Sequence, residues 1–477
     1  MLERISTPGL AIYTYLIVDP LTNQGVVIDA TRDVDPILQK IQKTGTSIIA
    51  LLETHVHADF LSGSKELKHQ LASSPPIFCS GLGGAKWVPN YTDKLVEDFF
   101  TIHLGSISLQ AWHTPGHTPE HIMWVIYNQN HDSKTPISAL TGDFLFVGSI
   151  GRPDLLGQNS LSALSDQLYQ SVFQTLPQLP GFLEIYPAHG SGSVCGKDID
   201  PAPSSTLTKE RQTNPFLQIQ EKDLWIKFIL DNLPPPPNYF SHMKQLNLQG
   251  PALLDTLKSI EEYPLKNINP AQPLNALMID LRSKEEFAEK HIAKSLNIPL
   301  TASFINWAPI VIPYQAEVHL IANDKMTVEQ AVKTLQIVGI DLVHFYTIFD
   351  SEALLSLSLK TSFYSVFTPQ ELQHRLLQNN QDFLLIDVRT PNEWQEGHIQ
   401  EAKNVSLNTF SETLHQLPKD KSIIVICKSG YRGSIAASML KKEGYAEVSN
   451  IQGGMQEWVQ LQLPITKIHK TVNIDFP

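Results

Sequence analysis

Short runs of apolar, β-branched and aromatic residues alternate with polar loops over the first 230 residues of the chain. The clearest runs are YTYLIV, GVVIDA, SIIALLE, ISLQAWH, HIMWVIY and FLEIYPAH. Their length and composition predict β-strands. Between them, residues 34–45 and 161–176 space their apolar side chains as amphipathic helices do. The pattern therefore predicts a mixed α/β domain with many strands.

Proline-rich connectors divide the chain after this domain. The run Pro234–Pro237 is unsuited to regular structure and predicts an extended, partly rigid linker. Further boundaries are predicted at Pro264, Pro270 and Pro273 and within residues 358–367. The next element is expected to begin with Thr368 as N-cap and Pro369 as first helical residue. We expect three domains, over residues 1–250, 251–360 and 361–477.

The last 210 residues contain an internal repeat. ALMIDLRSKEEFAEKHIAKSLNIPL at 276–300 matches FLLIDVRTPNEWQEGHIQEAKNVSL at 383–407, at a single shift of 107 residues. The matched positions are Asp280, Arg282, Phe287, His291, Ile292, Asn297 and Leu300 with Asp387, Arg389, Trp394, His398, Ile399, Asn404 and Leu407. Such agreement predicts two copies of one α/β module of about 100 residues.

The composition is that of a folded, multidomain protein, since 42% of the 477 residues are hydrophobic and 18% are charged. The net charge of −12 argues against nucleic acid and membrane partners. Three cysteines, Cys79, Cys195 and Cys427, are too few for a disulfide framework. We see neither a secretory signal nor an apolar stretch of membrane length, and therefore expect a cytoplasmic protein. The oligomeric state is open, a homo-oligomer included.

Histidines and aspartates follow separate apolar runs of the N-terminal domain. They are His55, His57 and Asp59 in THVHAD, His113 and His117 in HTPGHTPEH, Asp143 in LTGDFLF and His189 in IYPAHGSG. Alternation along an extended segment places His55 and His57 on one side, facing one cavity. Strand ends that bring imidazoles and carboxylates to one edge of a sheet predict a metal centre. The spacing alone does not decide between His113 and His117 as a ligand.

These motifs resemble the metallo-β-lactamase superfamily and, within it, the glyoxalase-II-like branch. THVHAD, HTPGHT, TGD, GRPDL and YPAHG occur in the family's order over residues 1–230. The resemblance implies an αββα sandwich with a metal site at one edge. The metal ligands that it implies are His55, His117 and Asp143. The residues that it implies as orienting the ligands and water are His57, Asp59 and His189.

Phe60 distinguishes this chain within the branch. Dinuclear thioester hydrolases of the family carry a histidine here that binds a second metal, so Phe60 favours a single ion. Two imidazoles and one carboxylate with open positions suit non-haem Fe(II) and O₂ chemistry. The persulfide dioxygenases of the superfamily use such a set, and their resemblance to this chain implies one Fe²⁺ per chain. A glyoxalase-II-like zinc thioester hydrolase is the alternative, because Asp59, Asp143 and His189 could still hold a second ion.

Residues near these motifs indicate how a substrate is held. Arg152 in GRPDL is a candidate anchor for the carboxylate of a thiol substrate, and a structural ion pair is the competing interpretation. The stretch around Cys195 resembles that of bacterial fusion members, and a structural thiol is favoured there. Animal members carry a tyrosine where this chain has Ser191, so a role for that tyrosine does not transfer. Cys79, between apolar residues, is expected in the core.

The stretch KSIIVICKSGYRGSIAASMLKKEGY places a thiol between a strand and a helix. The apolar run ends at Cys427, and a helix is predicted to begin near Ser434. Backbone N–H groups around Gly430 and the cations Lys428 and Arg432 favour a thiolate and a bound anion. We therefore predict that Cys427 carries a sulfane sulfur, assisted by Arg432. Lys428 and Gly430 are predicted to bind the substrate.

The C-x-x-G-x-R loop, together with IDVRTPNEWQEGHI and NIQGGMQEW, resembles rhodanese sulfurtransferases over residues 366–463. Asp387 and Arg389 are expected to support the scaffold rather than the chemistry. In the earlier copy, the aligned strand AEVHLIANDKM has Ala322 at the thiol position. That copy therefore resembles an inactive rhodanese module.

The whole chain resembles bacterial persulfide dioxygenase–rhodanese fusions, in which an αββα sandwich is followed by two rhodanese-like α/β domains. The resemblance implies that O₂ oxidises a low-molecular-weight thiol persulfide to sulfite and thiol. It also implies sulfur transfer between persulfide or sulfite and thiosulfate or thiol through Cys427, in sulfide detoxification. The thiol carrier and the direction of transfer are open. A sulfur-relay or sensing protein with a non-catalytic N-terminal domain is a further alternative.

Overall fold

The computed structural model describes residues 1–130, 132–233, 236–268, 275–357, 359–378 and 382–467. Of the predicted boundary residues, Pro234, Pro235, Pro270, Pro273 and residue 358 lie outside these ranges. The chain forms two compact units, one of residues 1–257 and 333–341 and one of residues 258–332 and 342–477. Both rhodanese-like copies fall mainly within the second unit, so the three predicted domain limits stay predictions.

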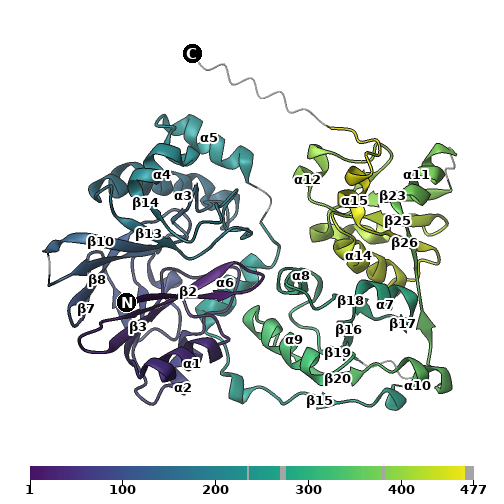
Figure 1. Ribbon diagram of the computed structural model, residues 1–477, viewed down its shortest axis with the longest axis horizontal. Helices are drawn as coiled ribbons and strands as arrows, with labels where there is room; N and C mark the ends of the chain where they lie inside the picture. The colour runs from purple at the N-terminus through teal and green to yellow at the C-terminus, as the bar shows by residue number, and fades with distance from the viewer. Residues whose placement is uncertain (131, 234–235, 269–274, 358, 379–381, 468–477) are drawn as a thin grey trace. The chain divides into compact units, whose positions relative to one another are not determined.

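Two six-stranded sheets form the first unit (Figure 1). The first has the order β1 (Leu2–Thr7), β2 (Ile12–Val18), β3 (Gln24–Ile28), β4 (Ser47–Leu52), β5 (Ile77–Ser80) and β6 (Lys94–Val96). The second has the order β14 (Ser205–Thr206), β13 (Glu184–Pro187), β10 (Asp132–Gly142), β9 (Ile122–Asn128), β8 (Ile107–His113) and β7 (Thr101–Leu104). All six apolar runs identified in the sequence lie in these sheets.

Helices cover the outer face of each sheet. They are α1 (Asp35–Thr44) and α2 (Ser64–Gln70) on the first sheet, and α3 (Gln158–Gln170), α4 (Leu207–Thr213) and α5 (Lys222–Asn232) on the second (Figure 1). Alternate residues of a strand enter different layers of the core. Tyr15 and Ile17 of β2 pack between the sheets, whereas Leu16 and Val18 pack toward α1. The αββα sandwich is thereby confirmed, and Cys79 lies in its core as predicted.

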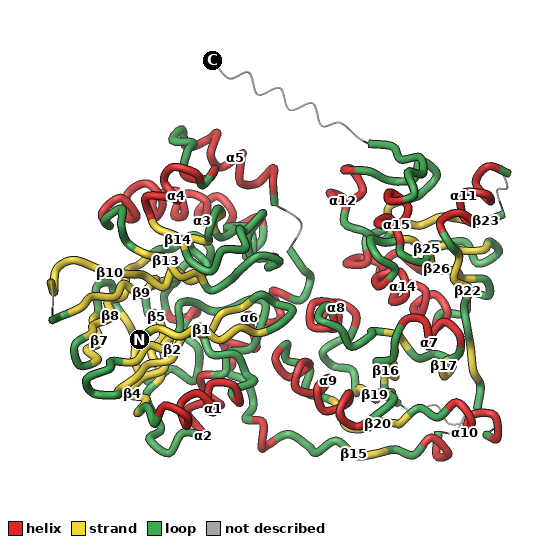
Figure 2. Tube along the Cα trace, in the orientation of Figure 1, coloured by secondary structure: helices red, strands yellow, loops and turns green. Residues whose placement is uncertain are grey.

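The second unit contains two five-stranded parallel sheets of the same design (Figure 2). One has the order β15 (Glu261–Glu262), β20 (Val343–Ile348), β19 (Val318–Ala322), β16 (Leu277–Asp280) and β18 (Leu296–Asn297). The other has the order β22 (Ser365–Phe367), β26 (Val448–Ile451), β25 (Ser422–Ile426), β23 (Phe383–Asp387) and β24 (Lys403–Asn404). The matching strand orders agree with the predicted repeat.

Helices connect these parallel strands. In the earlier copy they are α7 (Lys284–Glu289), α8 (Phe304–Val311), α9 (Lys325–Ile337) and α10 (Ser351–Ser356). In the later copy they are α11 (Pro369–Leu377), α12 (Pro391–Glu396), α13 (Phe410–Thr413), α14 (Tyr431–Lys442) and α15 (Gly454–Gln460). Thr368 caps α11 and Pro369 opens it, as the sequence predicted. Among the described residues, no helix is long and apolar enough to cross a membrane.

The two copies repeat the same buried contacts. Arg282 binds both carboxylate oxygens of Asp280, and Arg389 binds both oxygens of Asp387. The amide of Asn297 donates to the carbonyls of residues 280 and 282, and that of Asn404 donates to those of residues 387 and 389. The Asp–Arg pairs are thus part of the scaffold, as predicted.

Candidate metal centre and thiol site

Three candidate ligand atoms converge at one edge of the sandwich. Each belongs to a residue that follows the end of a strand. His55 follows β4, His117 follows β8 and Asp143 comes directly after β10. The Nε2 atoms of His55 and His117 lie 3.8 and 3.4 Å from Oδ2 of Asp143. All three side chains are buried, and none of these three atoms has a hydrogen-bond partner. Buried polar atoms are rarely left unpaired, so this convergence indicates a metal site.

Hydrogen bonds set both histidines in the form that a metal requires. Thr54 donates its hydroxyl proton to Oδ2 of Asp29 (2.8 Å), and Nδ1–H of His55 therefore donates to Thr54 Oγ1 (2.9 Å). Nδ1–H of His117 donates to the Arg152 carbonyl oxygen at 3.1 Å. Each Nε2 consequently points its lone pair at the site. Burial also keeps the rings neutral, because it lowers the pKa of His55 well below its ordinary value and that of His117 to about 4.

His189 and Asp59 support the third ligand. Nδ1 of His189 lies 2.6 Å from Oδ1 of Asp143, and Nε2 lies 2.8 Å from Oδ2 of Asp59. Burial alone lowers the pKa of His189, but the two carboxylates raise it well above its ordinary value. The resulting imidazolium keeps the pKa of Asp143 well below its usual range, although burial opposes this. Asp143 is therefore presented as a carboxylate with Oδ2 free for a metal.

His57 belongs to a separate buried group. Its Nε2 lies 3.1 Å from Oδ1 of Asp29 and 3.7 Å from Oε2 of Glu53. Burial opposes protonation of His57, yet Asp29 raises its pKa to about 9. The rings of His55 and His57 lie side by side, with centroids 4.2 Å apart, although their Nε2 atoms have different partners. That the two histidines face one cavity stays a prediction.

Phe60, where the sequence resemblance leads one to expect a histidine in a dinuclear hydrolase, is part of the buried surroundings of His57. Its ring is fully buried and lies 4.2 Å from the ring of His57. Nearby, Sγ of Cys195 lies within 4.8 Å of the ligand atoms of Asp59 and His189. Burial raises the pKa of Cys195 well above its ordinary value, so the thiol is protonated, which fits the structural role favoured for it.

Arg152 is engaged in internal contacts. Its Nε and Nη2 atoms donate to the two oxygens of Asp154 at 2.7 Å each, and Nη1 donates to the Val194 carbonyl at 3.1 Å. Its side chain has no exposed surface. This geometry favours the structural ion pair over the substrate anchor, and the anchoring role stays a prediction.

Several residues that support the metal centre were not identified from the sequence. Nε2 of His121 accepts the Asp143 N–H at 3.0 Å, and Thr114 accepts Nδ1–H of the same ring. Asn247 of α6 (Phe240–Gln249) donates to the carbonyls of His57 and Phe60 and accepts the Ser62 N–H, each at 2.8 Å. The second histidine of HTPEH was a sequence clue to His121, whereas α6 had no motif that linked it to the metal.

The thiol of Cys427 lies at the end of β25, under the loop that leads to α14. The Gly430 N–H donates to Sγ at 3.1 Å, and Gly430 adopts a left-handed conformation with φ of 89°. Lys428 is exposed, whereas Cys427 is buried. The helix begins at Tyr431, three residues before the predicted start, because Gly430 serves as its N-cap.

Arg432 is held in place by Glu393. Its Nη1 and Nη2 atoms lie 2.7 and 2.6 Å from the two carboxylate oxygens of Glu393. Burial raises the pKa of Glu393, but Arg432 outweighs this effect and lowers the pKa to about 2. Burial similarly opposes the charge of Arg432, but Glu393 and, to a lesser degree, Cys427 raise its pKa. The guanidinium therefore lies within electrostatic reach of the thiol.

The earlier copy has no thiol at the equivalent position. Asp387 of β23 is paired with Ile426, which precedes Cys427, and Asp280 of β16 is paired with Ile321, which precedes Ala322. The register therefore matches Ala322 with Cys427, as the sequence alignment predicted.

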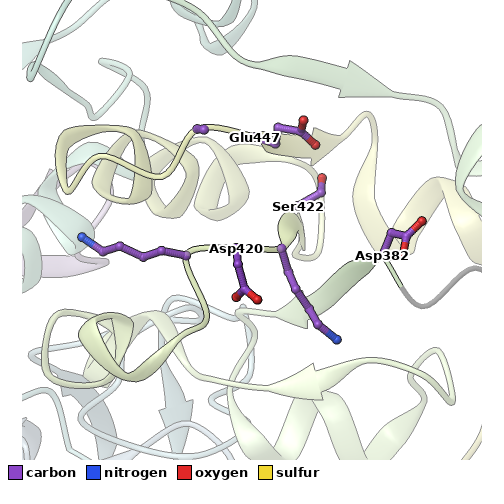
Figure 3. Close-up of a pocket in the computed structure, with 7 residues that line it drawn as sticks. Asp382, Asp420, Ser422 and Glu447 are labelled. Carbon is purple, nitrogen blue, oxygen red and sulfur yellow. The ribbon is translucent and has the colours of Figure 1, made fainter.

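A cavity of about 560 Å³ lies at the opposite end of β25 from Cys427. Its lining consists of Asp382, Lys419, Asp420, Lys421, Ser422, Ala446 and Glu447 (Figure 3). These side chains are mostly charged, and neither cysteine nor histidine is among them. The cavity is therefore not part of the thiol site.

Known proteins match both parts of the chain. Residues 7–191 match the metallo-β-lactamase superfamily, and residues 368–461 match the rhodanese-like domain. A mitochondrial persulfide dioxygenase from Homo sapiens is 30% identical over 238 residues, which cover 50% of this chain and 83% of that protein. A sulfurtransferase from Allochromatium vinosum is 35% identical over 96 residues, which cover 20% of this chain and 89% of that protein.

One solved structure aligns with more than the first unit. A metallo-β-lactamase from Staphylococcus aureus is 31% identical, with a TM-score of 0.65, over 73% of this chain and 98% of that one.

Proposed function

Because the chain belongs to the metallo-β-lactamase superfamily, with mitochondrial persulfide dioxygenases among its relatives, and ends in a rhodanese-like domain, we propose that it oxidises persulfides and transfers sulfane sulfur. The first reaction is RSSH + O₂ + H₂O → RSH + SO₃²⁻ + 2H⁺, where R is the thiol carrier. The second moves a sulfur atom between a persulfide or sulfite and a thiol or thiosulfate. We propose a cytoplasmic location, which suits three unpaired cysteines.

The observation that carries this proposal is the set of buried, unpartnered atoms of His55, His117 and Asp143. Two neutral imidazoles and one carboxylate suit a single non-haem Fe²⁺ per chain. An Fe²⁺ ion held there supplies the redox chemistry by which O₂ oxidises the persulfide sulfur. Phe60 in place of a histidine argues against the dinuclear zinc hydrolase, because an apolar ring offers no ligand for a second ion.

The surrounding residues fix the ligands and the charge of the site. Thr54 and the Arg152 carbonyl hold the two imidazoles by their Nδ1–H groups. His189 carries a proton between the carboxylates of Asp143 and Asp59, and His121 anchors the backbone of Asp143. These contacts give the ligands one orientation before a metal or substrate arrives.

The second reaction uses Cys427 as a nucleophile. Its thiolate attacks the outer sulfur of a persulfide, the sulfur–sulfur bond breaks, and the carrier thiol leaves after taking a proton. Sulfite then attacks the outer sulfur now held on Cys427, which forms thiosulfate and returns the thiolate. Arg432 and the Gly430 N–H stabilise the anionic sulfur during both transfers. The reverse direction uses the same groups.

Anaerobic metal analysis followed by oxygen uptake tests the proposal. Persulfides of glutathione, coenzyme A and bacillithiol, and inorganic polysulfide, are supplied to the full-length protein. We expect one iron per chain, persulfide-dependent O₂ consumption, and thiosulfate as the final product. The Cys427→Ser variant should consume O₂ but accumulate sulfite. Two zinc ions per chain with thioester hydrolysis and no O₂ uptake would support the hydrolase instead.

A further inference from the structure

The inactive rhodanese copy packs directly on the helix that follows the thiol loop. Asn297 of β18 accepts a hydrogen bond from Ser434 of α14, and the Asn297 N–H donates to Ser438 at 3.0 Å. These side chains are buried. Tyr364, in the segment between the copies, bonds to Ser434 at 2.8 Å. The start of α14 is therefore held by side chains from outside its own sheet.

The contacts continue onto the thiol loop itself. The Tyr431 hydroxyl donates to the Pro299 carbonyl at 2.8 Å. A Cβ on Gly430 would lie only 3.3 Å from Cε of Lys284, the first residue of α7. Gly430 also supplies the N–H that contacts Sγ of Cys427. The end of the Lys284 side chain, from the inactive copy, thus lies beside the loop that surrounds the thiol.

Trp307 of α8 contacts the second cation of the site. The Arg432 guanidinium carbon lies 5.6 Å from the centre of the Trp307 ring, within the range of a cation–π contact. Glu393 holds this guanidinium from the active copy, so Arg432 is held between a carboxylate and an aromatic ring.

Space for a small ligand adjoins Lys284. A cavity of about 370 Å³ is lined by Lys284, Glu285, Ala288 and Glu289 of α7, by Tyr364, and by Val366, Asn450 and Gln452 of the active copy. Asn450 donates to the Gly430 carbonyl at 2.9 Å, which connects the cavity wall to the thiol loop. Lys284 pairs with Glu285, whose side chain is mostly exposed, and such a pair is weak enough for Lys284 to exchange partners.

We propose that the inactive copy forms the second wall of the sulfur-transfer site, with Lys284 binding the anionic end of the sulfur compound and Trp307 positioning Arg432. The ligand class is a small oxyanion of sulfur, such as thiosulfate or sulfite, or the carboxylate of a persulfide carrier. This inference rests on the proposed function of Cys427. It explains why a copy without a thiol accompanies the active copy.

Steady-state sulfur transfer from thiosulfate to cyanide, with the full-length protein, tests Lys284. In Lys284→Ala we expect KM for thiosulfate to rise about tenfold, the loss expected for one hydrogen bond to a charged group, with kcat largely kept. Lys284→Arg should restore KM, and high salt should narrow the gap between wild type and Lys284→Ala. The control is Lys325→Ala, an exposed lysine at the start of α9, which should leave KM unchanged.

Trp307 is tested as a positioning residue. Trp307→Ala should lower kcat and increase the dependence of the rate on salt, whereas Trp307→Phe should retain most of the rate because it keeps an aromatic face. Wild-type KM and kcat in both Lys284→Ala and Trp307→Ala would overturn the inference. If Cys427→Ser were as active as wild type, the proposed function of Cys427 would fail instead.

Discussion

At the scale of single residues, Thr54 determines which nitrogen of His55 faces the metal site. Its hydroxyl accepts the Nδ1–H of His55 while donating to Asp29. Thr54→Val keeps the shape but removes this acceptor, and we expect metal affinity to fall about 10- to 100-fold. Competition with a chelator measures the metal affinity of wild type and variant. Thr101→Val in β7, away from the metal motifs, is the control, and equal affinities in the two variants would contradict the prediction.

The pairing of Arg152 predicts a loss of stability on its removal. Arg152→Ala leaves Asp154 without its partner, and we expect unfolding free energy to fall by about 3 kcal/mol. Metal retention should fall as well, because Arg152→Ala removes the side-chain contacts that fix the backbone at position 152, whose carbonyl accepts from Nδ1–H of His117. Thermal unfolding and the KM for a persulfide distinguish a structural ion pair from a substrate anchor. A raised KM with an unchanged melting temperature would show that Arg152 anchors the substrate.

The sequence indicated the three residues that converge in the candidate metal site, but not the charge state of their neighbours. His55, His117 and Asp143 lie in short motifs that can be recognised from the amino-acid sequence alone. The buried partners of His57 come from Asp29 and Glu53, which no motif joins to it. Likewise, the sequence allowed Arg152 to be interpreted as a substrate anchor. It does not show that Nε and Nη2 of Arg152 both donate to the carboxylate of Asp154.

At the scale of elements, α6 holds the metal-binding loop in position. Asn247 makes three hydrogen bonds to the backbone of residues 57–62. We expect Asn247→Ala to destabilise the first unit by about 3 kcal/mol, because it leaves buried backbone groups unpaired, and to speed metal loss to a chelator. Gln249→Ala on the exposed face of the same helix is the matched control. Identical rates of metal loss would show that α6 is not required.

The ion pair between Glu393 of α12 and Arg432 of α14 should make a pH-dependent contribution to the free energy of unfolding. Glu393 has a pKa lowered to about 2 by Arg432, so the folded state favours its charged form. The resulting stabilisation, roughly 2 kcal/mol, is complete above the ordinary pKa of a glutamate and is lost as pH falls toward 2. Urea unfolding at pH 7 should therefore separate wild type from Glu393→Gln, and the gap should shrink at pH 3. Glu396→Gln, exposed on α12, should show no such gap.

The ends of strands and helices were predictable where neighbouring residues in the sequence determine them. They were less predictable where contacts with distant parts of the chain determine them. The N-cap at Thr368 is a local arrangement, and it was predicted correctly. The start of α14 at Tyr431 depends on the left-handed Gly430 packed beside Lys284, a contact with the other copy that no local pattern contains. Similarly, α6 contacts the metal loop across a separation of nearly 190 residues.

At the scale of the whole molecule, the two copies share a scaffold but differ in the loop that matters for chemistry. The repeat was visible because both copies need the same buried Asp–Arg pair and the same asparagine. Counted from the matched positions, α14 begins at Tyr431, four residues after Cys427, whereas α9 begins at Lys325, three residues after Ala322. The loop of the earlier copy is therefore one residue shorter than the loop that surrounds Cys427.

A thiol alone should consequently not restore activity to the inactive copy. In the double variant Ala322→Cys with Cys427→Ser, we expect no sulfur transfer from thiosulfate. Asp324 explains part of this, because its carboxylate accepts the Thr327 N–H at 2.8 Å and occupies the helix N-terminus that an anion would need. Mass spectrometry after incubation with thiosulfate detects a persulfide at position 322. Its formation at a rate near that of Cys427 in the wild type would show that the short loop is no obstacle, and that the earlier copy lost activity through the single replacement of its thiol.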